Sequence, residues 1–212
     1  MKTVNYQDYL AGIPPKGQHI LAQERGDEIL VYQAFRPEIA QYALAHQQFG
    51  GAHYSFSRMT WIKPNFLWMM FRAGWASKAG QEYILGIWIK KSGFEEILAQ
   101  SAYSSFKAEI YADRESWRKD LEQKKARLQW DPDHNIYGGK EERRAIQLGI
   151  KGELLQQFNQ ETIVEIIDLR PFVLAQKAKI DAGQLSELLL PEEKVFRPKD
   201  KQLAAFLGLD ED

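Results

Sequence analysis

The stretch Arg58-Met-Thr-Trp-Ile-Lys-Pro-Asn-Phe-Leu-Trp-Met-Met-Phe-Arg-Ala-Gly-Trp75 joins a predicted strand to a predicted helix. The alternating residues before Pro64 predict a strand from Ser55 to Lys63, with polar and apolar side chains on both faces. Proline lacks the N–H that a sheet needs and suits the first turn of a helix. We therefore expect the strand to end at Pro64 and a helix to run from Asn65 to Ala73.

The same order of strand and then helix is expected on both sides of this stretch. Short runs rich in β-branched and aromatic residues predict strands, and apolar residues spaced three and four apart predict helices. We expect five or six strands and four or five helices, which gives an α+β (mixed α/β) fold with one mixed sheet. The expected strands cover residues 29–35, 55–63, 81–90, 128–132, 143–150 and 162–169.

The sequence predicts a single compact domain over residues 1–212, because no repeat, low-complexity tract or linker divides it. Residues 1–26 contain two prolines and two glycines that interrupt regular structure, so we expect an irregular N-terminal arm. Residues 27–182 form the expected core. Residues 183–212 alternate short apolar pieces with proline and charge, and we expect them to wrap the surface as a tail.

Composition excludes several classes of protein. The 28 basic and 29 acidic residues give a formal net charge of −1, so no global field attracts nucleic acid or an anionic membrane. No window approaches the roughly 20 apolar residues of a membrane span. The absence of cysteine excludes disulfides, thiolate metal sites and a cysteine nucleophile, and it is typical of a cytoplasmic protein.

The familiar catalytic and nucleotide-binding motifs are missing. The sequence has no Gly-x-Gly-x-x-Gly, no Walker loop, no His-Glu-x-x-His and no Gly-x-Ser-x-Gly. The four histidines, at positions 19, 46, 53 and 134, are scattered singly, so no metal site is expected.

The central stretch combines flat aromatic rings with positive charge. Trp61 and Trp75 could stack on a planar group, and Arg58, Lys63 and Arg72 could hold a phosphate, because guanidinium and ammonium groups bind phosphate oxygens well. Three unpaired cations would be costly in a core. The stretch thus predicts a site for a planar, anionic small molecule or a nucleotide.

A purely structural explanation of the same residues stays open. Arg58 could pair with Asp131 across neighbouring strands, and Arg72 could lie over the ring of Trp75. Trp68 and the methionines beside it are interpreted as core. Polar residues of the later strands complete the predicted cofactor-binding set, namely Gln129, Asp131, Arg144 and Gln147.

Five blocks of sequence together resemble the domain-of-unknown-function family numbered 4291, over about residues 18–175. This resemblance implies no activity, since the family's name records that none is assigned. The family often has an arginine just before the alanine that precedes the first strand, where this chain has Leu21-Ala22, so a ligand phosphate would need another partner here. The blocks are Val31–Ala34, the central stretch 58–75, Gly93–Glu95, Gln129–Pro132 and Arg144–Gly149.

The first functional hypothesis is a nucleotide-using transferase whose fold is similar to that of ADP-ribosyltransferases, with NAD as the expected cofactor. This is an analogy at the level of fold. Such chemistry needs a carboxylate that stabilises an oxocarbenium-like transition state. Glu165, on the clearest late strand, and Glu153 are the predicted catalytic residues.

Two other hypotheses come from different classes of function. In a nucleic-acid-binding module, tryptophan and phenylalanine would stack on unpaired bases and the arginines would follow the backbone, although the near-zero net charge argues against this. In a non-catalytic protein-interaction domain, exposed aromatic residues would bind a partner.

Overall fold

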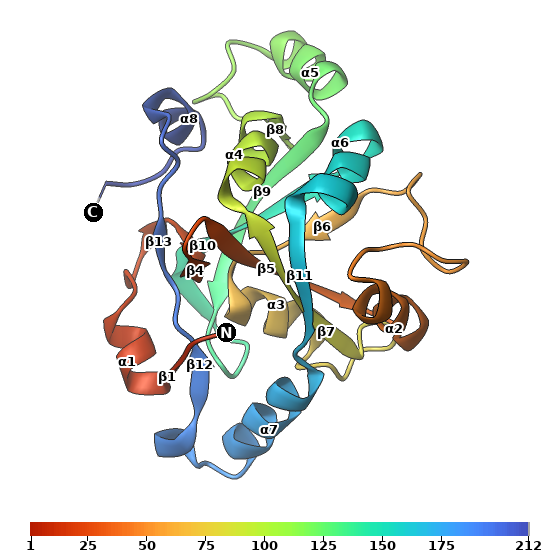
Figure 1. Ribbon diagram of the computed structural model, residues 1–212. Coiled ribbons are helices and arrows are strands. Elements are labelled where there is room, and N and C mark those ends of the chain that lie inside the picture. The colour runs from red at the N-terminus through yellow and green to blue at the C-terminus, as the bar shows by residue number, and fades with distance from the viewer. Residues whose placement is uncertain (212) are drawn as a thin grey trace.

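Two β-sheets form the centre of the fold in a computed structural model, which describes residues 1–211 (Figure 1). The expected α+β class is confirmed, but the strands form several sheets where one mixed sheet was expected, and many short strands were not foreseen. One sheet has the order β11-β7-β5-β4 and the other β2-β10-β9-β8, with β6 pairing to β10. The first contains β4 (Glu24–Arg25), β5 (Glu28–Phe35), β7 (Tyr83–Lys90) and β11 (Ile163–Asp168). The second contains β2 (Gly17–Gln18), β6 (Thr60–Ile62), β8 (Ser101–Tyr103), β9 (Ala126–His134) and β10 (Lys140–Ile150).

Strand β5 is buried on both faces, and its side chains alternate between two hydrophobic cores. Ile29 and Val31 pack in the core that includes residues of α2, α4 and α6, whereas Leu30 and Tyr32 pack in the core that includes residues of α1, α3 and α7. Helices therefore cover both faces of this sheet. The helices are α1 (Tyr6–Ala11), α2 (Pro37–His46), α3 (Phe66–Ala73), α4 (Lys91–Ala99), α5 (Arg114–Gln123), α6 (Gly152–Gln157), α7 (Arg170–Asp181) and α8 (Lys201–Phe206).

The two sheets are joined at Lys63. Its carbonyl accepts a hydrogen bond from Tyr32 N at 2.7 Å, and its N–H donates to Tyr32 O at 3.2 Å. On its other side, β6 pairs antiparallel with β10. The short strand β6 thus lies between the sheets and fixes the distance between them.

Helix α3 begins and ends where the sequence predicts. Asn65 caps it by accepting a hydrogen bond from Trp68 N at 2.6 Å, and Gly74 ends it in the left-handed conformation at φ 57°. The strand before it is much shorter than expected. Residues 55–59 form a turn instead of strand, with Arg58 N donating to Ser55 O.

The two ends of the chain pair with each other. β1 (Thr3–Asn5) pairs with β12 (Leu189–Pro191), and β3 (Ile20–Ala22) pairs with β13 (Lys194–Phe196), both antiparallel. Residues 1–26, expected as an irregular arm, therefore include a helix and four short strands. The C-terminal segment runs along one side of the molecule from β12 to α8 (Figure 1), but Leu190, Glu193 and Phe196 within it are buried, so the segment is built into the fold where a surface tail was expected. Within residues 1–211, no helix is long and apolar enough to cross a membrane.

Candidate functional site

The two faces of β6, β9 and β10 differ, since one carries several polar side chains and the other contributes to a hydrophobic core. Ile62, Leu128 and Leu148 point into the hydrophobic core. Their neighbours along each strand point the other way, because side chains alternate across a strand. The polar face carries Trp61, Lys63, Gln129, Asp131 and Gln147.

This polar face is the floor of a cleft of about 460 Å³. Helix α3 contributes Trp68 and Arg72, which lie on one side of the helix because they are four residues apart. Gln81, in the segment before β7, completes the lining. Six of the nine predicted cofactor-binding residues are thus brought together in one place.

Gly149 allows Trp61 to lie close against β10. The two residues are opposite each other in the antiparallel register. A Cβ atom on Gly149 would lie only 3.0 Å from the indole of Trp61 and 2.5 Å from Met59 Sδ. The bare backbone of this glycine therefore sets the depth at which the half-buried indole borders the cleft.

The carboxylate of Asp131 is held by two amides. Gln129 Nε2 donates to Oδ1 and Gln147 Nε2 donates to Oδ2, each at 2.8 Å. These bonds fix the orientation of the carboxylate and leave further lone pairs on both oxygens. The alternative in which Arg58 pairs with Asp131 is wrong, because Arg58 borders a separate hollow that Asp131 does not line.

Three hydrogen-bond donors of the cleft have no acceptor among residues 1–211. They are the ammonium of Lys63, the guanidinium of Arg72 and the indole N–H of Trp68, which is buried. Lys63 is only 6% exposed. Burial, together with the nearby Arg72 guanidinium, lowers the pKa of Lys63 to about 8, and Asp131 offsets only part of this effect. Lys63 and Arg72 therefore offer the cleft two donor groups that an anionic ligand could satisfy.

Trp68, which lines the cleft, belongs to a stack of three rings. Trp68 packs against Phe71 with ring centroids 5.5 Å apart, and His134 stacks on Phe71 at 3.5 Å. Burial lowers the pKa of His134, which favours a neutral ring in the stack. The stack keeps Trp68 in one orientation.

Three predicted binding residues lie elsewhere. Trp75 is 7% exposed and packs edge-on against Phe66, so its ring belongs to the core and Arg72 does not lie over it. Arg58 lies in the turn before β6 and borders a separate hollow. Arg144 is on the opposite face of β10 from Gln147, where it donates to the carbonyl of Trp130.

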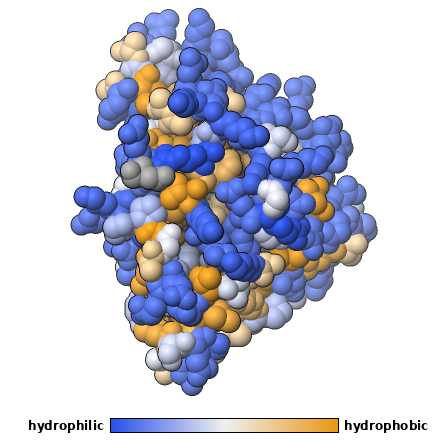
Figure 2. All heavy atoms as spheres, turned by 60° about the vertical axis from the view of Figure 1, so that its left-hand side comes forward, coloured by the Kyte–Doolittle hydropathy of each residue, from blue (hydrophilic) through white to orange (hydrophobic). Residues whose placement is uncertain are grey.

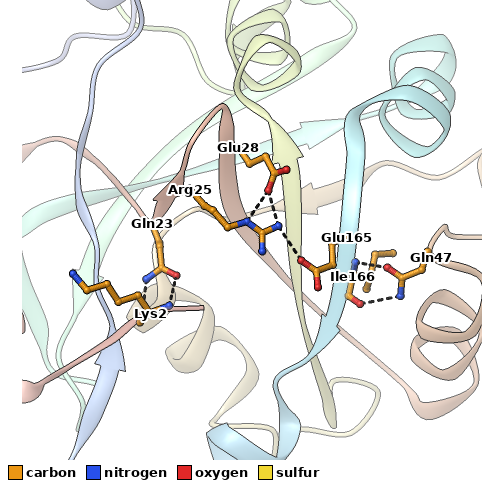
Figure 3. Close-up of polar contacts among 7 residues, drawn as sticks. All are labelled: Lys2, Gln23, Arg25, Glu28, Gln47, Glu165 and Ile166. Atoms are coloured by element: carbon orange, nitrogen blue, oxygen red, sulfur yellow. Dashed lines mark hydrogen bonds and ion pairs between the residues drawn. The ribbon is translucent and has the colours of Figure 1, made fainter.

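Neither predicted catalytic glutamate lines the cleft. Glu165 is on β11, at the edge of the other sheet, and accepts a hydrogen bond from Arg25 Nη2 at 2.9 Å (Figure 3). The same arginine also binds Glu28 on β5. Glu153 is exposed in the first turn of α6. The carboxylate in the cleft is that of Asp131.

Two residues of the cleft were not in the predicted set. Trp68 was assigned to the core alone, although its spacing from Arg72 places both on one side of α3. Gln81 precedes β7 in a segment with no regular structure, and no sequence pattern relates it to the other cleft residues.

A family model described as Domain of unknown function (DUF4291) matches residues 19–196. The chain belongs to this family. All eight residues that line the cleft lie inside the matched region. The sequence matches no curated protein.

Beneath the cleft of this DUF4291 member, a buried polar network anchors the start of α3. Glu193, from the C-terminal segment, accepts hydrogen bonds from Phe66 N at 2.6 Å and from Tyr9 Oη at 2.8 Å. Arg143 Nε donates to Asp133 Oδ2 at 2.6 Å in an ion pair that is almost fully buried. The network thus connects both ends of the chain to the helix that carries two cleft residues.

The network predicts that stability depends on pH through Glu193. Burial raises the pKa of Glu193 to about 8, above the ordinary value of 4.5. The folded state then binds the proton more tightly than the unfolded state, so this contribution to stability is complete below the ordinary pKa and is lost as pH rises toward the folded value. We expect the free energy of unfolding to fall by at most about 1.4 kcal/mol per pH unit relative to Glu193→Gln.

Urea unfolding of the native sequence and of Glu193→Gln, at about pH 5.5 and about pH 7.5, measures this difference. All other titrating groups are present in both proteins, so their contributions cancel when the two unfolding free energies are subtracted at each pH. A difference between the two proteins that is the same at both pH values would contradict a raised pKa at Glu193.

Proposed function

We propose that the chain is a nucleotide-binding protein that takes an NAD-like ligand in the cleft between β6, β9, β10 and α3. One observation carries the proposal: the two cationic groups without acceptors, on Lys63 and Arg72, border the same cleft as the half-buried ring of Trp61. Phosphate oxygens would satisfy the donors, and a base or nicotinamide would stack on the indole. The volume of about 460 Å³ lies within the range of small-molecule sites.

The same cleft supports a transferase of the ADP-ribosyltransferase kind, with Asp131 in the role first predicted for Glu165 or Glu153. The two glutamines hold this carboxylate in a fixed orientation. A fixed carboxylate can accept a hydrogen bond from a ribose hydroxyl and stabilise the positive charge that develops at the sugar carbon when its bond to nicotinamide breaks. Because the amides already orient the group, little reorganisation is needed during the reaction.

The two other hypotheses receive less support from the surface. Arg58 and Arg144 border separate hollows, so they do not form a continuous basic track with Arg72. Tyr137 is the one aromatic residue among the large exposed hydrophobic side chains of residues 1–211. On the face around the C-terminal segment, hydrophobic residues are interrupted by hydrophilic ones (Figure 2). A nucleotide in the cleft therefore remains our proposal.

Replacing Arg72 with alanine should weaken nucleotide binding and leave stability nearly unchanged. The side chain is exposed and makes no hydrogen bond or ion pair within residues 1–211, so its removal leaves no buried group unpaired. Loss of a charged hydrogen bond to phosphate should raise the dissociation constant about tenfold or more. Calorimetric titrations with NAD, ADP-ribose and AMP measure this, and NAD consumption is followed separately.

Arg58→Ala is the matched control, because it removes an exposed arginine near the cleft that does not line it. We expect its affinities to equal those of the native sequence. The proposal would be rejected by an absence of heat with all three ligands together with an absence of NAD consumption. Binding of single-stranded RNA or DNA at low salt, where the electrostatic contribution is largest, would favour the nucleic-acid hypothesis instead.

A further inference from the structure

Lys63 has an unusually fixed position for a lysine. Both of its backbone groups are bonded to Tyr32 on β5, and Pro64 follows immediately. The backbone of Lys63 therefore cannot swing, and the side chain always leaves the strand toward the cleft. A fixed backbone reduces the conformational freedom that a lysine loses when its amine is positioned for reaction.

The environment of the Lys63 amine raises the fraction that is neutral above that of an ordinary lysine. The side chain is 6% exposed, and no carboxylate in residues 1–211 forms an ion pair with it. With a pKa of about 8, roughly a tenth of the amines are neutral near pH 7. A buried lysine next to another cation is a known arrangement for an amine that attacks carbonyl carbon.

We propose that Lys63 forms an imine with an aldehyde or ketone that carries an anionic group and enters the cleft. The Nζ lone pair attacks the carbonyl carbon, a C–N bond forms, and the carbonyl oxygen leaves as water after gaining two protons. The nitrogen supplies these protons, so the step needs no oxidant or reductant. It uses the cleft of the proposed function but does not depend on nucleotide binding.

Two other cleft residues suit this step. Asp131 is the one carboxylate among the lining residues, and its oxygens retain lone pairs that can take a proton from the attacking amine and return it to the leaving oxygen. Arg72 can hold the anionic group of the ligand. The half-buried indole of Trp61 suits a planar ring, so the ligand class is an aromatic aldehyde with a phosphate or carboxylate.

Pyridoxal 5′-phosphate is a suitable probe, because it combines an aldehyde, a planar ring and a phosphate. The full chain is incubated with limiting probe, the imine is reduced with borohydride, and the modified lysine is identified by peptide mass spectrometry. We expect Lys63 to be modified at least about ten times faster than Lys119, an exposed lysine of α5 with no partner in residues 1–211. Lys63→Arg should abolish the fast modification, and Lys119→Arg should leave it unchanged.

Two further variants distinguish a built site from an accessible amine. Asp131→Asn should slow imine formation at saturating probe, and Arg72→Ala should raise the probe concentration needed for half-maximal modification. The inference is overturned if Lys63 of the native sequence is modified no faster than Lys119 is. This comparison needs no variant, so it holds even if Lys63→Arg fails to fold. Equal rates in the native sequence and in both variants would also overturn it. Fast modification of Lys63 without any nucleotide binding would support this inference and reject the proposed function alone.

Discussion

Replacing Arg143 with methionine should destabilise the protein by about 3–5 kcal/mol, because it leaves the Asp133 carboxylate buried without its partner. The side chain of Asp133 is fully buried and that of Arg143 is 4% exposed, so water cannot replace the lost guanidinium. Burial already raises the pKa of Asp133, and the guanidinium of Arg143 opposes that effect. Urea unfolding at neutral pH measures the loss.

The exposed ion pair between Lys177 and Asp181 on α7 provides the matched control. Lys177→Met removes the same kind of charge pair from the surface and should cost no more than about 0.5 kcal/mol. A second variant that combines Arg143→Met with Asp133→Asn should recover part of the loss, since it removes the uncompensated charge. If Arg143→Met lost less than about 1 kcal/mol of stability, Arg143 and Asp133 could not form an ionised pair that is shielded from water.

The sequence predicts best those elements whose boundaries are decided by neighbouring residues. Pro64, Asn65 and Gly74 define the start and end of α3, and each acts within one turn of the helix. The long apolar strands β5, β7 and β11 were likewise expected close to their observed positions. For these elements, local geometry and tertiary packing favour the same conformation.

The short strands at the two ends of the chain could not be predicted in this way. β1 and β3 contain three residues each, and their partners β12 and β13 are more than 170 residues away in sequence. No turn residue or periodicity marks such a pair. Their formation depends on the C-terminal segment crossing the fold, which a reading of consecutive residues does not reveal.

The sequence predicted the kinds of side chain in the candidate site better than it predicted which individual residues line it. Side chains alternate along a strand, so Gln129 and Asp131 had to share a face, whereas Arg144 and Gln147, three residues apart on one strand, had to lie on opposite faces. That rule separates Arg144 from the cleft without a structure. The place of Glu165 is different, since its strand was expected but the sequence does not say to which sheet that strand belongs.

Trp61 and Trp75, the two tryptophans predicted to bind a ligand, should respond in opposite ways when each is replaced with alanine. Trp75 is buried against Phe66, so Trp75→Ala should cost about 3–5 kcal/mol of stability. Trp75 also has a positive φ of 54°, but alanine shares that strain with tryptophan, and the comparison therefore isolates the ring. Urea unfolding measures the loss. Under conditions in which Trp75→Ala is folded, it should bind ADP-ribose with unchanged affinity.

Trp61→Ala should show the reverse pattern. The half-buried indole lies over Gly149 at the edge of the cleft, so its loss should cost only about 1 kcal/mol of stability. Stacking on a base is worth about 1–3 kcal/mol, so affinity for ADP-ribose should fall by about five- to 150-fold. If Trp75→Ala were fully stable but bound ADP-ribose more weakly, the ring of Trp75 would belong to the binding site and not to the core. Unchanged binding in Trp61→Ala would remove the stacking surface on which the nucleotide proposal depends, because Trp68 is too deeply buried to replace it.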